Sequence, residues 1–187
     1  MINDAGPVSK NGFQLKKLLR KDESWISFTL KSVLVLFLLF LAGVSFASRF
    51  MIVGDPQEER CIPGYTVYLI DKNDVELERG KLYMFHSKDL SPIYKEGTNM
   101  LKYLRGMPGD LVEVRENNQV FINEKAGEYG LDLAEEKLGR AASTFHGKSV
   151  LGTNQYWFLG TSTRSFDSRY WGSVANESIV GRAYPLF

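Results

Sequence analysis

The sequence predicts a mainly β, antiparallel fold that follows one N-terminal transmembrane helix. Residues 32–48 form an apolar block without a charged side chain. Beyond residue 65, short runs rich in β-branched and aromatic residues alternate with glycine and proline, which is typical of barrels and folded-over antiparallel sheets. The length of 187 residues, 44% of them hydrophobic, suits one domain of ordinary size with a short appendage.

The apolar block is slightly short for a membrane span. At about 1.5 Å per residue it would measure about 25 Å, against about 30 Å for a hydrocarbon core. Apolar residues on both flanks lengthen it, and Lys31 and Arg49 can extend to the two interfaces. We therefore expect a transmembrane helix over roughly residues 27–52, between a cytoplasmic segment at 1–26 and an exported domain at 53–187.

The charges beside the block predict its orientation. Residues 1–31 carry six basic and three acidic side chains, whereas residues 49–60 carry two basic and three acidic ones. Because the more basic flank stays in the cytoplasm, the later residues should lie across an inner membrane, in a periplasmic space. A cleaved secretory signal with a small-x-small site at 45–47 is the alternative, but the leader before the apolar core is long for one.

Strand signals dominate the exported part, after a polar linker at 55–60. We expect strands at 66–70, 81–86, 99–104, 111–115, 119–122, 154–159 and 179–184, because these runs are rich in β-branched and aromatic residues. Residues 116–118 resemble a hairpin turn, and residues 131–142 have a helix-forming composition.

Composition argues against several classes of function. The formal net charge of +1 argues against a nucleic-acid partner held by a basic surface. A single cysteine rules out an internal disulfide and a multi-cysteine zinc site, and two histidines argue against a histidine-built metal centre. We therefore expect no metal and no other cofactor.

Three segments carry the candidate chemistry. The first is residues 61–64 (Cys-Ile-Pro-Gly), the second residues 102–110 (Lys-Tyr-Leu-Arg-Gly-Met-Pro-Gly-Asp), and the third residues 160–172. Each has an ordinary structural interpretation by itself, since a lone cysteine is usually a small buried hydrophobe and a lone lysine a solvated surface charge.

Together, in this order and spacing, the segments resemble type I signal peptidases, the membrane-anchored Ser/Lys (S26-type) endopeptidases of the bacterial envelope. The resemblance covers about residues 28–187. The second segment matches the family pattern at Lys102, Gly106, Pro108, Gly109 and Asp110, and the third at Gly160, Ser165, Asp167, Ser168, Arg169 and Gly172. The compact size and single anchor are most similar to the conjugal transfer, TraF-type peptidases that process pilin; a compact general signal peptidase is the nearest alternative.

The resemblance implies a signal-peptidase-like fold and a nucleophile at position 61, where this chain has Cys in place of Ser. A thiol is more acidic and more nucleophilic than a hydroxyl, so the chemistry can proceed as a Cys61/Lys102 dyad. Ser165 would orient the Lys102 amine, while Asp167 and Arg169 would pair and hold their loop in place.

The substrate side is also implied by the resemblance. Pro63 and Gly64 would shape the turn where an extended substrate binds, and the backbone N–H of Cys61 would serve the oxyanion hole. General signal peptidases add a hydroxyl two residues before the nucleophile, but here that residue is Glu59, which cannot donate while ionised.

The sequence thus predicts an endopeptidase that cleaves exported precursors at the lipid bilayer, with a conjugative prepilin as the expected substrate and the conjugative transfer machinery as a further partner. A catalytically silent membrane scaffold of a secretion or pilus complex is a second hypothesis, motivated by Cys61 and Glu59. A third pairs Cys61 with His86 or His146, although no motif surrounds either histidine.

Overall fold

The computed structural model describes residues 24–57 and 59–187, and the chain divides into two units, residues 1–46 and 47–187. Helix α2 spans Trp25–Arg49 and buries none of its side chains. It is long and apolar enough to cross a membrane. Most of the expected cytoplasmic segment, up to residue 23, lies outside the described residues.

The helix ends earlier than the sequence suggested. Residues 50–52, expected within it, belong to strand β1 (Phe50–Gly54), which pairs antiparallel with β2 (Val67–Asp71). Arg49 ends the helix and forms an ion pair of 2.6 Å with Asp71 on β2. The end of helix α2 is determined by the pairing of β1 with β2, a strand that is distant in sequence. The apolar composition of residues 50–52 alone does not predict this pairing.

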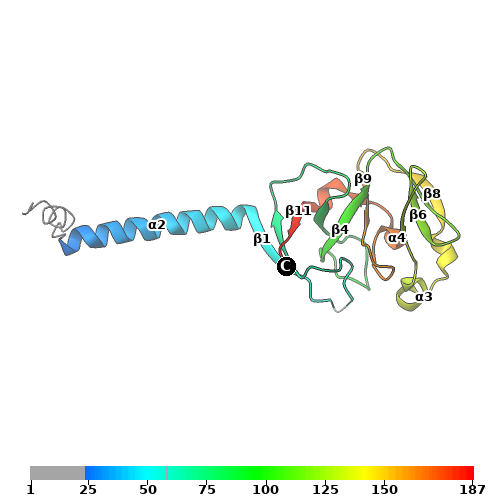
Figure 1. Cartoon of the computed structure of the whole chain (residues 1–187), viewed down its shortest axis with the longest axis horizontal. Coiled ribbons are helices and arrows are strands. Elements are labelled where there is room, and N and C mark those ends of the chain that lie inside the picture. The colour runs from blue at the N-terminus through cyan, green and yellow to red at the C-terminus, as the bar shows by residue number, and fades with distance from the viewer. Residues whose placement is uncertain (1–23, 58) are drawn as a thin grey trace, which may run out of the picture. The chain divides into compact units, whose positions relative to one another are not determined.

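Two antiparallel sheets build residues 47–187 (Figure 1). The larger has the order β1-β2-β11-β3-β4-β9-β10 and the smaller the order β7-β6-β5-β8. Every strand pairing is antiparallel, which confirms the predicted fold class. The remaining strands are β3 (Leu82–His86), β4 (Asn99–Gly106), β5 (Leu111–Val114), β6 (Gln119–Ile122), β7 (Lys125–Tyr129), β8 (Gly147–Val150), β9 (Gln155–Leu159), β10 (Val174–Ala175) and β11 (Ile179–Pro185).

The expected strands are all present, with ends that differ by one or two residues. The hairpin turn between β5 and β6 is also confirmed, with Asn118 at a φ of 61°. Helix α3 (Leu133–Leu138) is shorter than the helix-forming stretch at 131–142, because Gly139 adopts a left-handed conformation (φ 60°) and ends it. A 3₁₀ turn follows at Ala142–Phe145.

Strand β3 is buried on both faces and divides the apolar core. Leu82 and Met84 belong to a cluster on one face of the larger sheet, and Tyr83 and Phe85 to a cluster on the other. A third cluster joins the smaller sheet to α3 and β9. Cys61 packs in the first cluster, so the candidate nucleophile is anchored to the central sheet.

Candidate active site

A cavity of about 650 Å³ is lined by both reactive residues that the sequence analysis selected. Cys61 reaches it from the segment between β1 and β2, and Lys102 from β4. Cys61 is 8% exposed and Lys102 is 6% exposed. Met84, Met100 and other apolar side chains form much of the remaining wall. Cys61 and Lys102 therefore line the same, largely apolar cavity.

Lys102 is buried by the alternation of β4. It lies on the same face of the strand as Met100 and Leu104, and it is paired in register with Tyr83 of β3. Within residues 24–57 and 59–187, no hydrogen bond or ion pair engages its amine. The amine is thus available to a group that enters the cavity.

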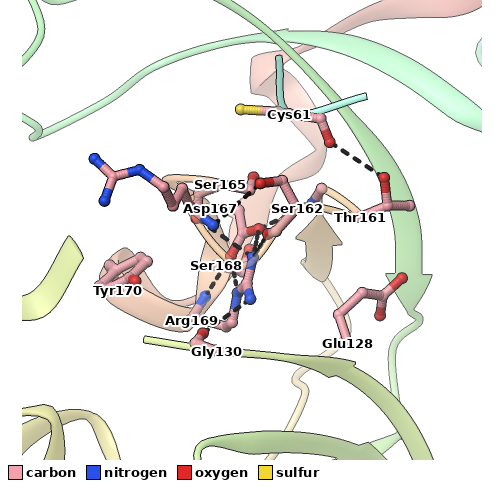
Figure 2. A network of polar contacts seen from close by, with 12 residues as sticks. Cys61, Glu128, Gly130, Thr161, Ser162, Ser165, Asp167, Ser168, Arg169 and Tyr170 are labelled. Atoms are coloured by element: carbon pink, nitrogen blue, oxygen red, sulfur yellow. Dashed lines mark hydrogen bonds and ion pairs between the residues drawn. The ribbon is translucent and has the colours of Figure 1, made fainter. Parts of the chain in front are cut away.

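Cys61 is attached to the loop after β9 through its backbone. Its carbonyl accepts hydrogen bonds from the Thr161 N–H at 3.0 Å and from Thr161 Oγ1 at 3.4 Å (Figure 2). The Cys61 thiol contacts Gln57 Oε1 at 3.7 Å. These contacts fix the candidate nucleophile against the third of the sequence segments.

Gly160 allows two site residues, Ser165 and Cys61, to approach each other. A Cβ at this position would lie 2.2 Å from Ser165 Oγ and 2.9 Å from the Cys61 carbonyl oxygen, so only glycine fits without displacement. The antiparallel register of β4 and β9 ends at the pair Tyr103–Leu159, directly before Gly160. Ser165 and the Cys61 backbone therefore both pack against Gly160.

Ser165 is fully buried, and its hydroxyl has no hydrogen-bond partner among the described residues. A buried polar atom is seldom left without a partner in a folded protein, so the Ser165 hydroxyl has room for one that enters the site. The predicted bond from Ser165 to the Lys102 amine is not among the described contacts, and the orienting role of Ser165 stays a prediction.

Asp167 and Arg169 form the most buried ion pair of the described residues, with both side chains fully buried and 2.7 Å between Nη2 and Oδ2 (Figure 2). Asp167 also accepts the Gly160 N–H at 2.9 Å, and Arg169 donates to the carbonyls of Gly130 and Ser162, each at 2.9 Å. Burial acts to lower the pKa of Arg169, but the hydrogen bond and charge of Asp167 outweigh it and raise that pKa above its usual value. The pair fixes the loop that carries Gly160 and Ser165.

Asp110 and Gly109, at the end of the second segment, stabilise the turn after β4. Asp110 accepts the Met107 N–H at 2.6 Å and the Asn123 Nδ2–H at 2.7 Å, and it pairs with Arg79 at 2.7 Å. Burial acts to raise the pKa of Asp110, but these donors, Arg79 first, leave it below its usual value. Gly109 takes a φ of 86°, which explains the glycine in this turn after β4.

The turn after the nucleophile is exposed and lies outside the cavity wall. Neither Pro63 nor Gly64 lines the cavity, and Gly64 has a left-handed φ of 99°. Their substrate-binding role stays a prediction. Glu59 does line the cavity, where its carboxylate pairs with Arg164, and Arg164 also binds Glu136 of α3.

The histidines lie elsewhere. His86 is exposed at the end of β3 and lines a different cavity, and His146 shares a hydrogen bond of 2.8 Å with Asn118. Neither lines the cavity of Cys61, which leaves the Cys/His hypothesis without support. Among the described residues, no group of three or more His, Cys, Asp or Glu side chains could hold a metal ion.

Two residues at this cavity were not predicted from the sequence, Gln57 and Arg164. Gln57 lies in the polar linker, which carries no motif that could have revealed it. Arg164 lies inside the third segment, and the acidic Glu59 just before Cys61 was the available hint of a cationic partner.

Comparison with known proteins agrees with the motifs. The family model described as signal peptidase, peptidase S26, matches residues 24–187. A probable signal peptidase I-2 from Synechocystis sp. is 32% identical over 111 residues, which cover 59% of this chain and 48% of the relative. Signal peptidase I from Pseudomonas fluorescens is 27% identical over 160 residues, covering 66% of this chain and 55% of the relative.

A signal peptidase I crystal structure from Enterococcus faecalis has 25% sequence identity and a TM-score of 0.36, covering 57% of this chain and 96% of that chain. The chain spans about half the length of the curated relatives it matches. The family model extends over nearly the whole described chain, and the chain therefore belongs to the signal peptidase family, peptidase S26.

Proposed function

We propose that this chain is a membrane-anchored endopeptidase that cleaves exported precursors, with Cys61 as nucleophile and Lys102 as its base. The observation that carries the proposal is that Cys61 and Lys102, both largely buried, line one cavity in a member of the signal peptidase family, and that no described residue engages the Lys102 amine. Helix α2 would be the anchor, with the basic N-terminal segment in the cytoplasm.

In the proposed reaction, the Cys61 sulfur attacks the scissile carbonyl carbon while the Lys102 amine takes the thiol proton. The tetrahedral intermediate collapses to a thioester, and the leaving amine receives that proton from Lys102. A water molecule, deprotonated by Lys102, then attacks the thioester and releases the acid product with the free thiol. Ser165 and the Asp167–Arg169 pair act by positioning.

An edge of β4 offers a place for the substrate backbone. Residues 99–102 pair with β3, whereas β9 pairs with β4 only from Tyr103 onward. Residues 99–102 line the cavity, together with Val53 and Gly54 of β1. An extended precursor can add to this edge as a further strand, which presents its carbonyl to Cys61.

The substrate that we favour is a conjugative prepilin with small side chains at the cleavage site. Two departures support a specialised substrate over general precursor processing: Cys at position 61 and Glu at position 59. The single candidate span of the described residues fits the same assignment.

The experiment follows precursor processing in cells that express the full chain. Cys61→Ala and Lys102→Met should each leave the precursor uncut, while the matched control Lys148→Met, on the exposed strand β8, should process it normally. The mass of the mature product separates hydrolysis, which adds one water overall, from ring closure after cleavage, which does not. Normal processing in both site variants would overturn the proposal, and full complementation by Cys61→Ala would identify the silent scaffold instead.

A further inference from the structure

We infer that the side-chain amide of Gln57 completes the oxyanion hole opposite Cys61; this inference rests on the proposed function. Gln57 lines the same cavity, and its Oε1 lies 3.7 Å from the Cys61 sulfur. Among the described residues, it is the side chain that hydrogen-bonds to the thiol. An amide at this distance can reach an oxygen on a carbon bonded to that sulfur.

The chain holds Gln57 in place through the end of β1. The Asp55 N–H donates to the Thr66 carbonyl at 2.9 Å, which extends the β1–β2 ladder by one residue. The Asp55 carboxylate then accepts the Gln57 N–H at 3.0 Å. Pro56, between them, has a restricted φ. The backbone of Gln57 is therefore held before a substrate binds, which keeps its side chain beside the thiol.

The site needs such a donor because the usual position is occupied by an acid. The Glu59 carboxylate is engaged by Arg164, from which it accepts a hydrogen bond. In the proposed reaction the Cys61 N–H would supply one donor, and a second donor is needed. A glutamine amide carries one acceptor and two donors, and a half-turn about its last torsion exchanges them.

The Gln57 amide would turn from acceptor to donor as the reaction proceeds. While the thiol is protonated, Oε1 accepts from the S–H, as observed. In the reaction, the carbon–sulfur bond forms, the carbonyl electron pair moves onto oxygen, and the thiol proton passes to the Lys102 amine. The Gln57 amide N–H then donates to this oxyanion. Collapse re-forms the carbonyl and breaks the carbon–nitrogen bond, and the leaving amine takes the proton from Lys102; Gln57 exchanges no proton.

Two reagents that modify the Cys61 thiol test whether Gln57 is an oxyanion donor. The full chain in detergent is used for both. Acylation by p-nitrophenyl acetate passes through a tetrahedral oxyanion, whereas alkylation by iodoacetamide is a displacement at a saturated carbon and forms none. Gln57→Ala should lower the acylation rate by about 10²–10³-fold and leave the alkylation rate within about twofold. Gln57→Glu keeps the shape but removes the donors, and it should lose acylation as well.

The matched control is Gln119→Ala on β6, which should leave both rates unchanged. Acylation of Gln57→Ala at the wild-type rate would overturn the inference. An equal fall in both rates would also overturn it, because Gln57 would then only position the thiol. If Gln57→Ala has a lower Tm than the wild type, the acylation and alkylation rates of Gln57→Glu provide the test instead. Failure of the proposed function is recognised separately, as precursor cleavage that persists in Cys61→Ala.

Discussion

Replacement of Asp167 by alanine should leave the Arg169 guanidinium as a buried charge without its counter-charge. Both side chains are fully buried, and removal of one partner from such a pair costs about 3–5 kcal/mol. Four backbone carbonyls continue to accept from the guanidinium, those of residues 129, 130, 162 and 165. We therefore expect the lower end, about 3 kcal/mol, and a fall in Tm on the order of 10 °C for a unit of this size.

Thermal unfolding of the full chain in detergent, followed by near-ultraviolet circular dichroism, measures this loss. Trp157 and Trp171 lie in the β-rich unit and report on its packing. A second variant, Asp167→Leu combined with Arg169→Met, removes both charges and should recover part of the lost Tm, because no buried charge remains.

The matched control is Glu113→Ala. Glu113 and Arg115 are also two residues apart and pair at 2.8 Å, but their side chains are 29% and 42% exposed. Loss of this pair should cost less than about 1 kcal/mol. If Asp167→Ala lowers Tm no further than Glu113→Ala does, the buried pair does not hold the loop and the reasoning is refuted.

Three further changes test other parts of the structure. Gly160→Ala places a Cβ 2.9 Å from the Cys61 carbonyl oxygen, so it should destabilise the fold by about 1–3 kcal/mol and abolish precursor cleavage; an unimpaired variant would contradict the packing described. The folded protein holds the pKa of Asp110 below its usual value. The ionised carboxylate therefore contributes its full stabilisation above about pH 4, and this is lost as the pH falls through the lower folded-state pKa. Asp110→Asn should make the unfolding free energy depend less on pH in the acidic range. Arg164→Gln breaks exposed ion pairs and should leave the urea midpoint of unfolding almost unchanged, with an even smaller effect in concentrated salt.

The sequence predicts the strands that are rich in apolar side chains. Strand β3 is buried from Leu82 to Phe85, and its composition alone is diagnostic. Strands β7 (Lys125–Tyr129) and β8 (Gly147–Val150) are mostly exposed edge strands, so their sequences lack an apolar pattern. Their conformation depends on backbone pairing with β6 and β5, which no local pattern encodes.

The candidate site was partly predictable for a similar reason. The three segments contain the residues that meet at the cavity, and the pairing of Asp167 with Arg169 follows from their spacing. What the sequence could not reveal is which backbone groups complete the site. The carbonyls of Tyr129 and Gly130, which accept from Arg169, and the side chain of Gln57 come from segments without a motif, and only the folded chain brings them there.

The central claim is that Cys61 is acylated during cleavage and that Lys102 promotes the step. The most direct measurement is the mass of the tryptic peptide 61–72 after an acid quench during turnover of a precursor by the full chain. We predict that this peptide carries the N-terminal fragment of the substrate as a thioester in the wild type and that Lys102→Met forms almost none. Cleavage that proceeds with peptide 61–72 unmodified, and at an undiminished rate in Cys61→Ala, would contradict the account.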